Sequence, residues 1–131
     1  MKKVEYKFAD YELSDENILF IRLKSGMEID LAVSKEMQKI SLEITANKKF
    51  VALVDARVQV VVSKEAREWG STAEAQTNML AQAIVVNTPA NKLVGNFIIK
   101  FHRPPARTKL FSDEPSVLQW LREQKREFGL N

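Results

Sequence analysis

The chain has 131 residues and a mass of 15.0 kDa, a length typical of one domain. Hydrophobic residues make up 45% and charged residues 28%, with 4 Gly and 4 Pro, and this composition excludes collagen-like, low-complexity and disordered chains. The lack of Cys excludes disulfide scaffolds and thiolate metal sites, and a single His, His102, excludes multi-histidine metal sites. We therefore expect no metal and no cofactor. The net charge is +3.

The beginning of the chain is charged and contains no uninterrupted apolar stretch of the kind found in a signal peptide. No apolar run reaches the length of about 18 residues that a membrane-spanning helix needs. Repeats, linkers and shifts of composition are also absent. The sequence therefore predicts one cytoplasmic domain over residues 1–131, without membrane insertion.

The first elements are predicted strands. Residues 6–13 and 17–23 have strand composition and are separated by a turn, and a second turn ending at Gly26 leads into residues 27–33. In this last stretch apolar residues alternate with Glu28 and Asp30, which is typical of a half-buried strand. We expect an antiparallel meander of three strands.

A helix should follow, because Ser34 is a good N-cap and apolar residues then recur at helical spacing. Residues 50–54 are almost all apolar, as in strands that are covered on both faces. Residues 58–62 are interpreted as an extended connection. Ser63 then caps a short helix over residues 64–69.

Strands and helices alternate in the rest of the chain. A second apolar strand over residues 79–86 precedes a helix that starts at Pro89, and residues 108–111 form a last strand before a helix that ends at Phe128. Such alternation implies right-handed crossovers and parallel strands. The expected fold class is α/β, with a mixed sheet, an antiparallel N-terminal meander and about four helices packed mainly on one face.

Asp55 and Arg57 are candidate ligand-binding residues. Asp55 ends a predicted central strand, at the edge where open α/β sheets bind ligands. The alternative is that Asp55 pairs with Arg57 or caps a loop.

A second candidate site lies at the start of the helix predicted after residue 86. Asn87 and Thr88 with Lys92 combine free backbone N–H groups, the positive end of a helix and an ammonium group, which suit a phosphate or carboxylate. The surrounding stretch between Glu74 and Asp113 contains no acidic residue. Helix capping alone is the alternative explanation for these residues.

The same predicted helix carries a candidate dimer interface. Gly95, Asn96 and Ile99 share the face away from its apolar stripe, and Gly within a helix costs up to about 1 kcal/mol. Close approach of a second chain explains both the glycine and the exposed isoleucine, so we expect a homodimer. An ordinary exposed isoleucine is the alternative.

Several stretches together resemble a family of small bacterial proteins with a STAS-like (SpoIIAA-like) fold: Leu53-Val54-Asp55, Ser63-Lys64-Glu65-Ala66-Arg67, Ala83-Ile84-Val85-Val86-Asn87-Thr88-Pro89, Val94-Gly95-Asn96-Phe97 and Thr108-Lys109-Leu110-Phe111-Ser112-Asp113-Glu114. Its wider relatives include anti-sigma-factor antagonists, sulfate-transporter tail domains and SEC14-like lipid carriers. The resemblance implies an α/β fold and a non-enzymatic role. Antagonists of this type are phosphorylated on a hydroxyl just after the strand that ends in Asp, where this chain has Ala56. Ser63 is the nearest hydroxyl, and the N-cap role explains it better.

We therefore expect a non-enzymatic interaction or regulatory module with an unknown protein partner and no phosphorylation switch at the usual position. The alternative is a carrier or sensor of a small apolar or anionic ligand, as the SEC14-like relatives suggest. No phosphate-binding glycine loop, nucleophile elbow or cluster of acids with histidine is present, so no catalytic residue is assigned. No RNA-binding aromatic motif surrounds Trp69 or Trp120, so nucleic acid is not an expected partner.

Overall fold

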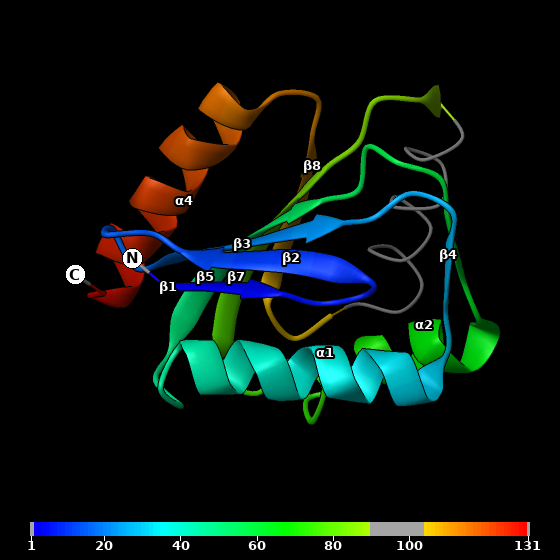
Figure 1. The fold of residues 1–131 in the computed structure, drawn as a ribbon. Helices are drawn as coiled ribbons and strands as arrows, with labels where there is room; N and C mark the ends of the chain where they lie inside the picture. Colours follow the sequence, from blue (N-terminus) through cyan, green and yellow to red (C-terminus); the bar gives the residue numbers. More distant parts are fainter. Residues whose placement is uncertain (1, 90–103, 131) are drawn as a thin grey trace.

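A computed structural model describes residues 2–89 and 104–130 of the chain (Figure 1). A six-stranded sheet has the order β1-β2-β3-β5-β7-β8, and a separate two-stranded sheet pairs β4 with β6. The strands of the main sheet are β1 (Lys2–Glu5), β2 (Ala9–Leu13), β3 (Ile18–Leu23), β5 (Phe50–Asp55), β7 (Met79–Val85) and β8 (Arg107–Phe111). Those of the small sheet are β4 (Met27–Ile29) and β6 (Val60–Val62), and the described helices are α1 (Leu31–Ile44), α2 (Lys64–Gly70) and α4 (Glu114–Phe128).

The pairing directions confirm the predicted α/β class. β1, β2 and β3 are antiparallel neighbours, whereas β3, β5, β7 and β8 run parallel. The strand β1 was not predicted, because its sequence is mostly charged and has no apolar pattern. All four of its residues are exposed in the structure. It is an edge strand, where exposed charged side chains are common.

Residues 27–33 do not form one strand. β4 ends at Ile29, and Asp30 is the N-cap of α1, with its side chain accepting a hydrogen bond from the Val33 backbone N–H at 2.8 Å. The predicted cap Ser34 instead lies inside the helix, and its N–H donates to the Asp30 carbonyl. β4 also leaves the main sheet and pairs in parallel with β6, so the stretch interpreted as a connection contains a short strand.

The core has two parts, one on each face of the main sheet. One face packs against Val117 and Leu121 of α4, and the other packs against Ile44 and other residues of α1. Figure 1 shows α4 on one side of the sheet and α1 and α2 on the other. Two of the three described helices therefore share one face, as expected, and α4 covers the other. No strand follows α4, so the crossover rule does not fix its face.

α2 begins at the predicted cap Ser63, and α4 begins in the same way at Asp113. Ser63 caps α2 through a hydrogen bond from the Ala66 N–H at 3.1 Å, and Asp113 caps α4 through one from the Ser116 N–H at 2.8 Å. Phe128, the last residue of α4, is exposed, and Arg107 lies over its ring, 4.6 Å from the centroid. The helix predicted from Pro89 falls mostly on residues 90–103, outside the described residues.

Candidate functional site

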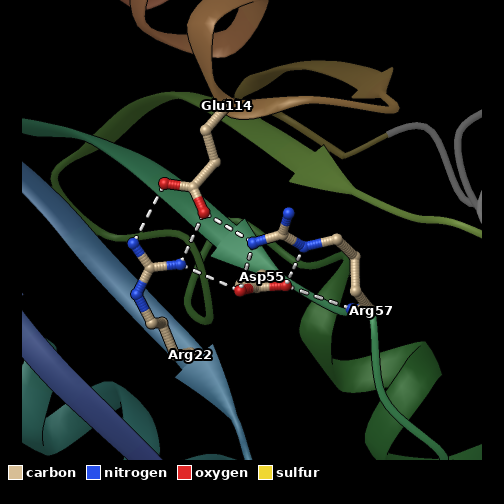
Figure 2. A network of polar contacts seen from close by, with 4 residues as sticks. All are labelled: Arg22, Asp55, Arg57 and Glu114. Carbon is tan, nitrogen blue, oxygen red and sulfur yellow. Dashed lines mark hydrogen bonds and ion pairs between the residues drawn. The ribbon is translucent and has the colours of Figure 1, made fainter.

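Four charged side chains meet at the carboxyl ends of the parallel strands (Figure 2). Asp55 is the last residue of β5, and the parallel register places Arg22 of β3 directly opposite it. Arg57 follows β5 by two residues, and Glu114 is the first residue of α4. Two predicted site residues, Asp55 and Arg57, therefore lie together, and the structure adds Arg22 and Glu114 to them.

The two carboxylates and two guanidinium groups form a closed network. Arg57 donates from Nε to Asp55 Oδ1 at 2.9 Å and from Nη2 to Asp55 Oδ2 at 2.8 Å. Arg22 donates from Nη1 to Asp55 Oδ2 at 2.9 Å, and its two terminal nitrogens donate to Glu114 at 2.8 and 3.0 Å. Arg57 Nη2 also donates to Glu114 Oε2 at 2.5 Å. We call these four residues the arginine–carboxylate cluster.

The cluster favours the charged form of each member. Hydrogen bonds from Arg57, and further ones from Arg22, lower the pKa of Asp55 from 3.8 to about 2 against the opposing effect of burial. Hydrogen bonds from Arg22 lower the pKa of Glu114, and those from Glu114 raise the pKa of Arg22. The Asp55 side chain is 15% exposed, so its interactions are weakly screened by solvent.

Two positive and two negative charges in the cluster cancel. The carboxylates already accept bidentate hydrogen bonds, so an incoming ligand would have to displace an arginine. The observed contacts correspond to the alternative interpretation of Asp55, namely pairing with Arg57. They join β3 and β5 to the start of α4, and the role of Asp55 and Arg57 in ligand binding stays a prediction.

The other predicted site residues are not part of the cluster. Asn87 and Thr88 follow β7 and are exposed, and the contacts described above do not involve them. Lys92, the third residue of the predicted anion site, lies outside the described residues. The predicted dimer residues Gly95, Asn96 and Ile99 also lie outside them.

The acid-free stretch is partly neutralised by another part of the chain. Arg107 donates to Glu127 Oε2 at 2.5 Å and to Gln124 Oε1 at 2.8 Å, both on α4. This pairing could not be predicted from the sequence, because Glu127 and Gln124 lie 20 and 17 residues from Arg107 along the chain. The local excess of positive charge is therefore smaller in the fold than in the sequence.

The residues that the structure describes border a partly open hollow of about 590 Å³ on the face of the sheet opposite α4. Its apolar lining comes from the main sheet, the helices α1 and α2 and the small sheet: Ile21, Val54, Ile84, Met37, Leu42, Ala66, Trp69, Ile29, Val60 and Val62. Small-molecule sites in proteins have volumes of about 300–1,000 Å³ and mostly apolar walls. The hollow has the size and lining of such a site.

Sequence reasoning missed the hollow because its walls come from elements far apart in the chain. Alternation along β3, β5 and β7 does assign Ile21, Val54 and Ile84 to one face of the sheet. Sequence does not show whether helices cover such a face completely. Ala56, which follows β5, also lines the hollow.

The described residues contain neither a group of three or more His, Cys, Asp or Glu side chains arranged to hold a metal ion, nor a helix with the length and apolarity needed to cross a bilayer. Ser63 acts as the N-cap of α2, which is the role preferred from the sequence.

The fold defined by this mixed sheet and its helices is SpoIIAA-like. A crystal structure of an uncharacterised DUF3478-family protein with a SpoIIAA-like fold, from Shewanella loihica PV-4, is similar to this chain with a TM-score of 0.62 and 18% sequence identity. The similarity covers 86% of this chain and 91% of that chain. It confirms the fold class that the sequence resemblance implied.

Residues 11–125 match the family model described as a domain of unknown function, DUF7793, and the chain belongs to this family. The search of curated proteins gave no match. The comparisons therefore establish the fold and the family.

Proposed function

We propose that this protein acts by binding and not by catalysis, and that its hollow takes a small apolar molecule. The observation that carries the proposal is the hollow itself, with a volume of about 590 Å³ and a mainly apolar lining. Each 100 Å² of apolar surface removed from water contributes about 2.5 kcal/mol to the free energy of binding. An apolar ligand can therefore bind in the hollow without any specific polar contact. This function is the carrier or sensor alternative that the resemblance to SEC14-like relatives suggests.

The arginine–carboxylate cluster is closed and neutral, and it lies on the α4 face of the sheet, whereas the hollow lies on the α1 face. We therefore assign the cluster a structural role in holding α4 and place ligand binding on the other face.

A protein-interaction module is the second candidate, and the edge strand β1 favours it. β1 pairs with β2 on one side and ends the main sheet, and all four of its residues are exposed. Such an edge can pair with a strand of a partner. This candidate predicts a protein that works with an empty hollow.

Binding of the uncharged fluorescent probe phenylnaphthylamine tests the first candidate. We expect saturable binding with a blue-shifted emission, and Ile84→Trp should lower the affinity at least tenfold, or about 1.4 kcal/mol, because the larger side chain occupies the hollow. Phe20→Trp is the matched control, since Phe20 packs on the α4 face and the substitution should leave probe binding unchanged. Circular dichroism would verify that both variants fold.

Absence of saturable binding would contradict the carrier role. If Ile84→Trp and Phe20→Trp both fold and lose probe affinity equally, phenylnaphthylamine does not bind in the hollow. Either result would favour the interaction module.

A further inference from the structure

The outer edge of β1 has no paired strand in the described part of the chain. β1 ends the main sheet, and its four residues are all exposed. The Tyr6 N–H donates to the Ala9 carbonyl at 3.1 Å, which closes the turn between β1 and β2. Because the direction of hydrogen bonding alternates along a strand, the backbone groups of Val4 also face β2, whereas those of Lys3 and Glu5 point outward. These outward N–H and C=O groups can pair with another strand.

The sequence of β1 is complementary in charge to itself. A second copy of the chain can approach this edge in the antiparallel direction, about a two-fold axis perpendicular to the sheet. With the axis at Val4, Lys3 lies opposite Glu5 of the second copy, and Glu5 lies opposite its Lys3. Each of these two pairs exchanges two backbone hydrogen bonds and places opposite charges side by side on one face of the sheet. The exposed Val4 side chain meets Val4 of the second copy.

The neighbouring registers lack this complementarity. An axis at Lys3 would place two lysine side chains opposite each other, and an axis at Glu5 would place two glutamates opposite each other. Like charges in directly opposed positions destabilise a pair of strands. The charges of β1 therefore favour the register centred on Val4, in contrast to edges that lysine side chains protect from pairing.

Both charged side chains are available for this pairing. The Lys3 side chain is 69% exposed, and its Nζ lies 4.0 Å from Glu12 Oε1. An exposed ion pair of this kind contributes little to stability, so Lys3 can turn towards Glu5 of a second copy at small cost. Among the described residues no cation forms an ion pair with Glu5. A second copy would supply one.

We propose that β1 pairs with β1 of a second copy of this chain, antiparallel and centred on Val4, so that the two main sheets form one continuous sheet. This inference goes beyond ligand binding and does not depend on it, because no residue of β1 lines the hollow. The pairing involves only a short strand from each copy. A contact of this size gives a dimer that dissociates on dilution.

A single-cysteine test locates the two-fold axis. The chain has no cysteine, so Val4→Cys introduces the only thiol. In the proposed register the two Val4 positions are directly opposed, with Cα atoms about 4.5 Å apart, a distance that permits a disulfide. Lys3→Cys is the matched control, because the two Lys3 positions are diagonal neighbours about 7–8 Å apart, too far for a disulfide.

Mild oxidation should therefore convert Val4→Cys into a covalent dimer at least ten times faster than Lys3→Cys. The rates are measured by electrophoresis without reducing agent. Equal rates, or faster cross-linking of Lys3→Cys, would overturn the proposal, because the axis would then not pass through Val4.

Charge reversal tests the two Lys3–Glu5 pairs. Sedimentation equilibrium should show that the wild-type chain dimerises with rising concentration. Lys3→Glu makes both pairs Glu–Glu and should raise the dimer Kd at least tenfold, and adding Glu5→Lys to the same chain should restore it. Lys109→Glu is the matched control, since it makes the same change of charge at an exposed position of β8, the opposite edge strand, and should leave the Kd unchanged.

Two results would overturn the inference. One is a wild-type chain that stays monomeric up to millimolar concentration, and the other is a dimer whose Kd does not change in folded Lys3→Glu. The cross-linking of Val4→Cys remains decisive if circular dichroism shows that Lys3→Glu does not fold. Folded Lys3→Glu should bind phenylnaphthylamine as the wild-type chain does, so failure of this inference and failure of the proposed function are distinguishable.

Discussion

Asp55 accepts hydrogen bonds from two arginine side chains and from the Arg57 backbone N–H. These donors stabilise its ionised form in the folded chain and lower its pKa to about 2. In the unfolded chain this carboxyl has a pKa near 3.8. The contribution of Asp55 to stability is therefore complete above the unfolded value and is lost as the pH falls towards 2.

Replacing Asp55 by Asn should remove this pH dependence. A shift from 3.8 to about 2 corresponds to about 2 kcal/mol, so the wild-type protein should lose about that much unfolding free energy between about pH 5 and pH 2 in excess of the variant. Urea unfolding of both proteins across this range measures the difference. Parallel pH curves would show that the cluster does not hold the Asp55 carboxylate in this way.

Sequence reasoning could identify only the local part of the cluster. Asp55 and Arg57 are two residues apart, so their pairing was one of the alternatives considered. Arg22 lies 33 residues from Asp55, and Glu114 lies 92 residues from Arg22. Their contacts depend on the parallel register of β3 with β5 and on the position of α4, which no local pattern specifies.

At the scale of elements, most strands and helices could be predicted from apolar periodicity and capping residues, but the start of α1 was wrong. Leu31 and Val33 continue the alternation of β4 and also fit a helix, and Asp30 and Ser34 are both good N-cap residues. The structure starts the helix at the earlier cap. The ambiguity arose because Leu31 and Val33 fit both the strand and the helix period, and because either of two residues could cap the helix.

This choice of cap is testable with a matched pair of variants. Asp30→Ala removes the acceptor of the Val33 N–H and should lower the unfolding free energy by about 1 kcal/mol. Ser34→Ala lies inside the helix and should change it by less than about 0.5 kcal/mol. Thermal unfolding measures the loss of stability in each variant. A larger loss of stability in Ser34→Ala than in Asp30→Ala would contradict the assigned helix start.

At the scale of the whole molecule, the order of strands and helices indicated a parallel sheet but not the distribution of helices over its faces. The α1 crossover between β3 and β5 and the α2 crossover between β5 and β7 place both helices on one face. α4 follows the last strand and covers the other face. The hollow depends on how completely α1, α2 and the small sheet cover their face, which is a property of packing in three dimensions.

The predicted homodimer belongs to the same scale and stays a prediction, since Gly95, Asn96 and Ile99 lie outside the described residues. Ile99→Asp should convert a dimer into a monomer if this face is the interface. An unchanged native mass in that variant would exclude it.

Native mass spectrometry of freshly purified protein tests the central claim most directly, because one spectrum reports both the subunit number and any retained small molecule. A protein that carries an apolar molecule in the hollow should show additional mass under native conditions that disappears on denaturation, and Ile84→Trp should lack it. A native mass that equals a whole number of bare chains, in a protein that also fails to bind phenylnaphthylamine, would contradict the account.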